Sequence, residues 1–513
     1  MRKPLLSLGL VALLAAACNS ASSGASTPAG GYVPPPPEHH QPPPPCCEPV
    51  PSFAAPTPYD GVTFADPGLN PFIDPRQDNQ STFGLDVDTA SYTVARRFIA
   101  DGNLPDPASV RVEEFVNFFD QGYAAPDDDA FAIRADGGPS PFLAADETLL
   151  RIGIKARDVA EAARPSAALT FVIDVSGSMS RENRLELVKQ SLGLLVEMLR
   201  PDDSVAIVVF GTDARVALPP TRAGDAATIL GAVAELHPEG STNAAAGLAL
   251  GYEVAEGSVV RGGINRVILA SDGVANVGTT DADAILSRIR DGTDTGIQLV
   301  AIGVGMGNFN DVLLERLADD GDGFYAYVDD IDEARKVFVS DLTGTLQSVA
   351  LDARAQVDFD EHAVEAYRLV GYENRAVPDD QFRNDGVDAG AIGAGHQVTA
   401  LYAVRLSGEG RPGSRIATVS LRWTDPATGR PAELAEDVFP ADLAATFGGT
   451  AAMFKLDALV AATAEHFRGS PWGTTYRLKD VLAVADELTN ELPKTDDVRG
   501  FLTLLANATE LER

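Results

Sequence analysis

Short, fully apolar segments alternate with amphipathic ones between residues 168 and 346 of this chain. The apolar segments are predicted strands, at 169–173, 205–210, 266–270, 298–304 and 324–328. Between them, apolar residues recur with helical spacing at 184–200, 226–236, 244–256, 282–290, 312–318 and 331–346. Strands that are apolar on both faces need helices on both faces to cover them. The pattern therefore predicts an α/β domain over residues 168–348, with a mostly parallel sheet between two layers of helices.

Oxygen-bearing side chains follow the ends of these predicted elements at three places. Asp174, Ser176 and Ser178 come directly after the first apolar strand, and Asp272 follows the strand at 266–270. Thr242 precedes the helix that begins near residue 244. Ligands of such sheets bind outside the carboxyl ends of the strands, so we expect the three loops to converge at one edge.

The convergence would form a cage of oxygen atoms with only two formal negative charges. Hard, six-coordinate cations such as Mg²⁺ or Mn²⁺ suit such a cage, whereas softer metals prefer Cys or His. The alternative is that these Ser and Thr side chains cap helices and the Asp residues stabilise turns. Three segments in this order, each at the end of an element, favour the metal site.

These motifs resemble the metal-ion-dependent adhesion site of von Willebrand factor type A domains, which have a Rossmann-like fold. The resemblance covers residues 168–346, and all five ligand positions are filled. Further tracts resemble a bacterial lipoprotein family that joins an N-terminal segment, a type A domain and a C-terminal domain of unknown function, at 86–92, 305–310, 371–375 and 393–402.

The resemblance implies a metal held partly by side chains and partly by water, with one position open. In adhesion-type relatives an Asp or Glu of a protein partner fills that position, and the threonine, here Thr242, often switches between direct and water-mediated contact. An under-neutralised cation gains both a bond and charge compensation from an incoming carboxylate. A protein partner that supplies an acid group is therefore the predicted ligand.

The N-terminus predicts export and lipidation. Arg2 and Lys3 precede an apolar run that ends at Ala17, and this run is too short to span a bilayer. Cys18 after three alanines resembles the bacterial lipobox, which makes residues 1–17 a lipoprotein signal peptide and Cys18 the lipidated residue. Ordinary cleavage and secretion is the alternative. The predicted location is the cell envelope, with a lipid anchor in the outer membrane of a Gram-negative bacterium.

The rest of the chain divides by composition. Residues 18–75 are a Pro-rich tether that includes Cys46 and Cys47. Residues 76–167 are a segment of helices and strands, with helical periodicity from Phe83 onward and Asp88 or Thr89 as a helix N-cap. A β-sandwich-like region is predicted at 349–440 and a helical region at 441–513.

Composition narrows the function. The 40 Lys and Arg residues against 74 Asp and Glu residues give a formal charge of −34, which argues against nucleic-acid binding and against attraction to anionic lipids. A metal-dependent hydrolase is one alternative to the binding function, but His237, the nearest histidine in sequence, is predicted to be part of a loop. A structural envelope scaffold without metal-dependent binding is another alternative. We expect a binding protein and not an enzyme.

Overall fold

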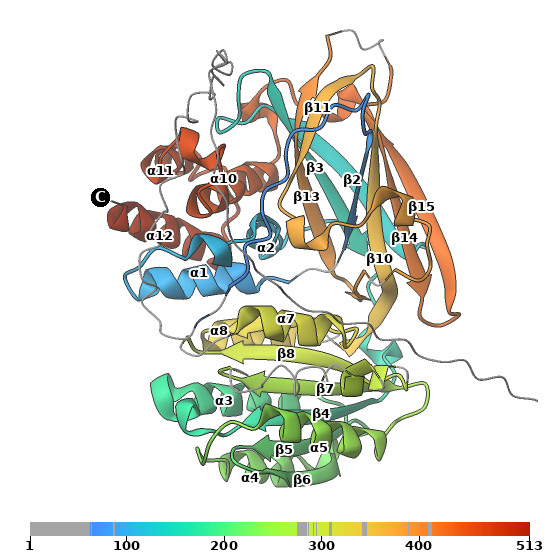
Figure 1. The fold of residues 1–513 in the computed structure, drawn as a ribbon, viewed down its shortest axis with the longest axis vertical. Helices are drawn as coiled ribbons and strands as arrows, with labels where there is room; N and C mark the ends of the chain where they lie inside the picture. The colour runs from blue at the N-terminus through green and yellow to red at the C-terminus, as the bar shows by residue number, and fades with distance from the viewer. Residues whose placement is uncertain are drawn as a thin grey trace, which may run out of the picture. The chain divides into compact units, whose positions relative to one another are not determined.

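A six-stranded sheet forms the centre of residues 167–328 in the computed structural model (Figure 1). Its order is β6-β5-β4-β7-β8-β9, and all neighbours are parallel except β6, which is antiparallel to β5 at one edge. The strands are β4 (Ala167–Asp174), β5 (Ser204–Phe210), β6 (Ala214–Arg222), β7 (Ile264–Ser271), β8 (Gln298–Val304) and β9 (Tyr325–Val328). The predicted α/β fold is confirmed.

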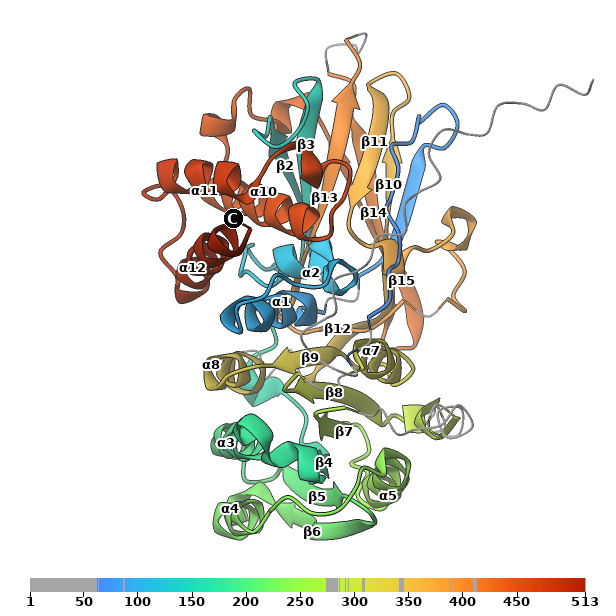
Figure 2. The ribbon, with the colours of Figure 1, turned by 60° about the vertical axis from the view of Figure 1, so that its left-hand side comes forward.

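Helices cover both faces of this sheet (Figure 2). One layer holds α3 (Arg184–Met198), α4 (Ala226–Ala234) and α8 (Ile331–Arg335), and the other holds α5 (Ala244–Glu256) and α7 (Asp311–Asp319). Every residue of β4 and β7 is buried, because apolar helix faces pack against the sheet from both sides. The predicted helix at 331–346 begins as an α-helix that ends at Arg335 and continues as a π-helical turn at Lys336–Ser340, and residues 341–345 lie outside the described part of the chain.

Two antiparallel sheets form a sandwich, but its strands are not confined to the predicted region at 349–440, because three of them come from before residue 157. One has the order β1-β10-β14-β15, with β12 also on β10, and the other has the order β11-β13-β3-β2. Residues of both sheets share one core, in which Phe359 stacks on Tyr367 and meets the edge of Tyr402. The strands are β1 (Gln80–Gly84), β2 (Phe131–Gly138), β3 (Glu147–Ala156), β10 (Ser348–Phe359), β11 (Val364–Val370), β12 (Ile392–Gly393), β13 (Gln397–Leu406), β14 (Ala417–Asp425) and β15 (Arg430–Val438).

Residues that precede the six-stranded sheet in sequence contribute to both of these antiparallel sheets. β1 pairs with β10, and β3 lies between β2 and β13. Helical periodicity from Phe83 is therefore the wrong interpretation at the start of the segment: Phe83 lies in β1 and is fully buried. The residues that carry the predicted periodicity, Tyr92, Ala95, Phe98 and Ile99, do lie on a helix, at Ala90–Ala100.

A group of helices shares a second core beside the sandwich. It consists of α1 (Ala90–Ala100), α2 (Val112–Asn117), α10 (Ala452–Phe467), α11 (Leu478–Glu487) and α12 (Asp496–Leu511). Tyr92 of α1 contacts the rings of Phe115, Phe118 and Phe119. Phe98 on the same helix belongs to the core around α5 and α7. Helix α1 therefore joins the helical group to the six-stranded sheet.

The structure describes residue 62 and residues 64–85, 88–273, 285, 287–290, 292–293, 295–306, 310–340, 346–387, 389–408 and 413–512. Among these, no helix has the length and apolar character needed to cross a bilayer. Short 3₁₀ turns lie at 107–109, 161–163, 177–183, 223–225, 373–375, 379–381, 440–442, 447–449 and 473–475.

Candidate metal site

The loop after β4 gathers the first three predicted ligands. Asp174 is the last residue of β4 and is fully buried. Its Oδ1 accepts a hydrogen bond of 2.7 Å from the backbone amide of Ser176. The chain then turns into the 3₁₀ segment Gly177–Asn183, which places Ser176 Oγ and Ser178 Oγ 2.9 Å apart. One short loop thus holds a carboxylate and two hydroxyl groups together.

The end of β7 adds the second carboxylate. The Ser178 hydroxyl donates to Asp272 Oδ1 over 2.9 Å, and the Ser271 hydroxyl donates to Asp174 Oδ2 over 2.7 Å. Because β7 is the parallel neighbour of β4, the two loops emerge side by side at the carboxyl edge of the sheet. Asp174, Ser176, Ser178 and Asp272 are therefore linked through continuous hydrogen bonds.

Thr242 lies on a third loop next to this group. The amide of Gly177 donates to the carbonyl of Gly240 over 3.2 Å, so the Thr242 loop contacts the loop after β4 directly. Gly240 has φ +74°, and a Cβ there would lie 2.5 Å from Thr212 Oγ1. The packing of Gly240 against Thr212 therefore requires glycine. Thr242 itself is half-buried, and the side chain of Asn243 caps α5 by accepting from the amide of Ala246.

Burial disfavours the ionised form of the Asp174 carboxylate. Desolvation raises the pKa of Asp174 to about 6, and the nearby charge of Asp272 adds to the shift. Hydrogen bonds from Ser176 and Ser271 oppose it, but both are uncharged donors. A cation would stabilise the ionised form, and the available donors are all oxygen atoms, which fit a hard divalent ion such as Mg²⁺ or Mn²⁺. The predicted ligands that would hold it are Asp174, Ser176, Ser178, Thr242 and Asp272.

Two side chains at this site were not predicted from the sequence. Ser271 orients the Asp174 carboxylate, as described above, and Arg184 contacts Asp272. Arg184 Nη1 donates to Asp272 Oδ2 over 2.7 Å, and the side chain is only 3% exposed. An arginine as the first residue of a helix faces the positive end of the helix dipole, so its presence there indicates a specific partner. That position signals that Arg184 needs a partner, but it does not identify Asp272.

The segment between the loop and α3 is held in an unusual conformation. Glu182 and Asn183 both have left-handed backbone angles, φ +50° and +57°, and α3 begins at Arg184, where the predicted helix begins. The Glu182 carboxylate lies 3.1 Å from a guanidinium nitrogen of Arg97 on α1. An ion pair therefore joins this segment to the N-terminal helix.

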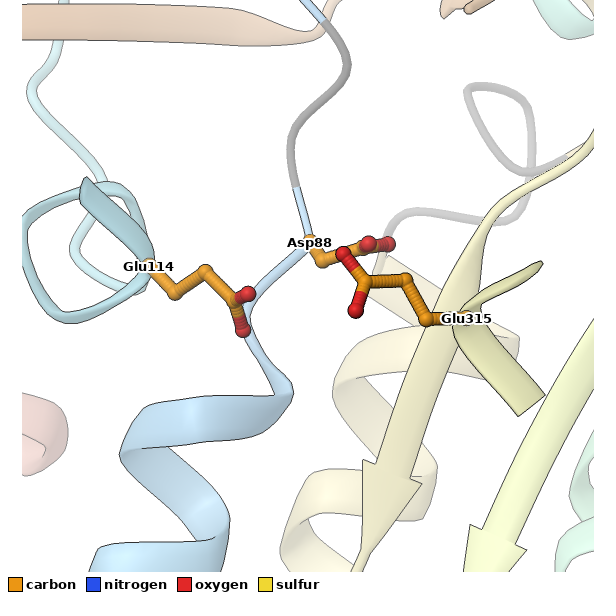
Figure 3. A group of neighbouring side chains, drawn as sticks. All are labelled: Asp88, Glu114 and Glu315. Atoms are coloured by element: carbon orange, nitrogen blue, oxygen red, sulfur yellow. The ribbon is translucent and has the colours of Figure 1, made fainter. Parts of the chain in front are cut away.

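A second group of acidic side chains lies away from the sheet edge (Figure 3). Asp88, Glu114 and Glu315 each place a carboxylate oxygen within 4.8 Å of the other two. Arginines already supply positive charge here: Arg375 lies 2.6 Å from Asp88 and 3.0 Å from Glu315, and Arg111 lies 3.0 Å from Glu315. We assign this group as a buried ion-pair network rather than as a second metal site.

The network explains why Asp88 does not act as the predicted helix cap. Its Oδ1 accepts from the backbone amide of Tyr325 over 3.0 Å, and Oδ2 accepts from Arg375. Thr89 occupies the N-cap position of α1, but its side chain makes no capping bond to the described residues of the helix. Burial raises the pKa of Asp88 and of Glu315, with their arginine partners opposing the shift.

Other predicted features lie elsewhere. His237 is exposed and its ring contacts the carbonyl of Glu235, in keeping with the predicted loop. Cys18, Cys46 and Cys47 are outside the described residues, so the lipid anchor and the role of the tether stay predictions.

Comparisons with known proteins agree with the fold. Residues 168–340 match the model of the von Willebrand factor type A domain, residues 59–151 match a model described as von Willebrand factor, and residues 344–511 match "Uncharacterized protein YfbK, C-terminal". The uncharacterized protein YfbK of Escherichia coli is 36% identical over 477 residues, which cover 86% of this chain and 82% of that protein.

More distant relatives share a smaller part. Inter-alpha-trypsin inhibitor heavy chain H3 of Homo sapiens is 29% identical over 167 residues, covering 30% of this chain and 18% of that protein. A solved von Willebrand factor type A protein from Catenulispora acidiphila is 17% identical, covers 73% of this chain and 89% of that chain, and has a TM-score of 0.45.

The six-stranded sheet, its two helix layers and the family match define a protein with a von Willebrand factor type A domain. Beyond that class, the chain belongs to the family of the uncharacterized protein YfbK.

Proposed function

We propose that this protein binds a partner protein through a divalent cation held by Asp174, Ser176, Ser178, Thr242 and Asp272. The observation that carries the proposal is the continuous hydrogen bonding from Asp174 through the two serines to Asp272 at the carboxyl edge of the sheet. The cation, Mg²⁺ or Mn²⁺, would supply an open coordination position for an Asp or Glu of the partner. Type A domains generally mediate protein–protein interactions, which supports a binding function.

The local charge supports an acidic partner group. The site offers two carboxylates and three neutral hydroxyl groups, so a bound divalent ion retains an affinity for further negative charge. The chain as a whole carries a formal charge of −34, which disfavours nonspecific approach by anions. Recognition of a carboxylate therefore depends on the metal rather than on the overall field of the protein.

The N-terminal sequence supports a location in the cell envelope. In this proposal Cys18 carries the lipid, the chain from there to residue 61 forms the tether, and the described part of the chain reaches its partner from an outer-membrane anchor. The predicted tether at 18–75 is too long, because Phe64 packs against the core around α5 and α7 and Ile73 exchanges backbone hydrogen bonds with Tyr367. The tether's Pro-rich composition gives an extended spacer, which extends the reach of the metal site.

Isothermal titration with MgCl₂ and MnCl₂ tests the metal site directly. The unaltered protein should bind one divalent ion, and Asp174→Ala and Ser176→Ala should weaken binding at least about tenfold, because each removes a predicted ligand. Ser180→Ala is the matched control: Ser180 is on the same loop, is exposed, and its hydroxyl donates only to the carbonyl of Gly177 among the described contacts.

Partner capture tests the second half of the proposal. Immobilised protein should retain an envelope protein in the presence of Mg²⁺ and release it on addition of a chelator, and the Asp174→Ala variant should not retain it. Equal retention by the variant and the unaltered protein would contradict metal-dependent binding, even if the metal site itself exists.

A further inference from the structure

The guanidinium of Arg184 places a positive charge beside the proposed metal site. Arg184 is buried beside Asp272, with Nη1 2.7 Å from Asp272 Oδ2 and Nη2 2.7 Å from the carbonyl oxygen of Met306. The other oxygen of the same carboxylate, Oδ1, faces Ser178. One oxygen of Asp272 is thus directed to the proposed ligands and the other to the guanidinium.

The position of Arg184 is enforced from two sides. Gly305, which follows β8, has φ +73°, and a Cβ at this residue would lie 2.1 Å from Arg184 Nε. The guanidinium therefore fills space that only a glycine leaves free. Glu182 is the other acid near Arg184, at 3.6 Å, but its side chain is partly exposed and it also pairs with Arg97. Asp272 is the close and buried partner.

This arrangement changes the charge of the site. Among the described residues of the site, two carboxylates and one guanidinium leave one net negative charge, so a bound divalent cation makes this group positive by one unit. Without Arg184 the cation would be neutralised by the two carboxylates. The open coordination position attracts a carboxylate in either case, but the attraction is stronger where the loaded site remains positive.

We propose that Arg184 is a positioning and charge-setting residue that weakens the hold of the site on its metal and strengthens the hold of the loaded metal on a partner's carboxylate. The inference rests on the proposed function, since it concerns the same site. It predicts that metal binding and carboxylate binding respond to Arg184 in opposite directions, which a purely structural role would not produce.

Arg184→Gln and Arg184→Lys separate charge from shape. Gln can still donate a hydrogen bond to Asp272 but is neutral, whereas Lys keeps the charge. Mg²⁺ affinity is measured by titration calorimetry. Carboxylate affinity is measured by titrating acetate into the Mn²⁺-loaded protein and following the relaxation rate of water protons. This rate falls as acetate displaces metal-bound water.

Arg184→Gln should bind Mg²⁺ about threefold to tenfold more tightly and acetate more weakly by a similar factor. Arg184→Lys should keep both affinities within about threefold of the unaltered protein. If Arg184→Gln weakens both affinities or changes neither, or if Arg184→Lys behaves like Arg184→Gln, the inference is overturned. Should Arg184→Gln fail to fold, as judged by circular dichroism, the Lys variant decides alone: retention of both affinities supports the inference and loss of either overturns it.

Failure of this inference and failure of the proposed function give different results. If the unaltered protein binds neither Mg²⁺ nor Mn²⁺ at millimolar concentrations, the metal site itself is absent. If it binds them and only the opposite response to Arg184→Gln is missing, the proposed function stands and the role of Arg184 is wrong.

Discussion

Buried carboxyl groups occur at several places among the described residues, and their neighbours give them different chemistry. Asp174 is surrounded by hydroxyl and amide donors, so its charge is best matched by an added cation. Glu114 also accepts from an amide, that of Ser91 at 2.8 Å, but its second oxygen lies 3.4 Å from the guanidinium of Arg111. At Glu114 the protein supplies a positive charge itself, but burial outweighs its effect on the pKa of Glu114.

Glu114 gives a prediction for the pH dependence of stability. Burial, opposed by Arg111 and reinforced by Glu315 and other acids nearby, raises the pKa of Glu114 to about 8 from an ordinary value of 4.5. The folded state therefore holds a proton that the unfolded state releases, and this contribution to stability is present below pH 4.5 and is lost as the pH rises through 8. Glu114→Gln mimics the protonated form and should remove the effect.

Urea unfolding at pH 5.5 and pH 8 measures it. The unaltered protein should lose about 3 kcal/mol more unfolding free energy over this interval than the Glu114→Gln variant. Parallel losses in the two proteins would show that Glu114 is ionised in the folded state throughout.

Single residues also mark the limit of prediction from sequence at the site. Asp174, Ser176, Ser178 and Asp272 were predictable because a motif at the end of an apolar strand has a local cause, and the structure brings these four together. Arg184 was not predicted to contact Asp272, because that contact depends on the path of the chain after β8. No local pattern shows where a distant glycine leaves room for a guanidinium.

Helix α7, like α1, links the type A domain to the rest of the described chain. Asp311 and Glu315 lie on this helix and pair with Arg111 at 2.6 and 3.0 Å, and Arg111 belongs to the segment before α2. Arg375, after β11, pairs with Glu315 from the sandwich. The two arginines attach one helix to two other parts of the fold.

Removal of Arg111 tests this attachment. Arg111→Met should destabilise the protein by about 3–5 kcal/mol, since it leaves the acids of the network buried with one cation fewer. Arg316→Met is the matched control on α7 itself: Arg316 is exposed and lies 3.8 Å from Asp320, so its loss should cost less than about 0.5 kcal/mol. Chemical denaturation measures both. Equal effects of the two variants would mean that the network does not hold α7.

At the level of elements, apolar strands and amphipathic helices were the predictable part. β4 is apolar along its whole length and α3 repeats its apolar residues with helical spacing, so the local sequence identifies the one as a strand and the other as a helix. β1 was misassigned because its five residues are stabilised by pairing with β10, a strand far away in sequence. Pairing of this kind has no trace in local periodicity.

The type A domain is inserted into a second unit whose two halves are separated in sequence. The first half supplies β1, β2 and β3, and the second supplies β10 to β15. The ends of the insertion lie close together: Arg157 accepts, through its carbonyl, from the amide of Gly395, and Gln347 accepts from the amide of Ala394. Insertion at neighbouring points of a surface leaves the host sheets intact, which explains how one chain builds both units.

Truncations test this description of the whole molecule. A chain in which residues 160–345 are replaced by a Gly-Ser linker of about six residues should fold and unfold cooperatively, because its strands and the neighbouring ends of the cut are retained. Residues 344–513 alone should not unfold cooperatively, although one family model covers 344–511. In that fragment β13 would lose its pairing with β3, which runs from Gln397↔Lys155 to Arg405↔Glu147. Thermal unfolding followed by circular dichroism distinguishes the two.

The exposed α1 face, where Val94 and Phe98 pack against the inserted domain, should lower the melting temperature of the linked chain but not abolish its transition. A cooperative transition in residues 344–513 alone would show that the sandwich does not need its first half. In that case partner binding by the C-terminal region could be measured separately from the metal site.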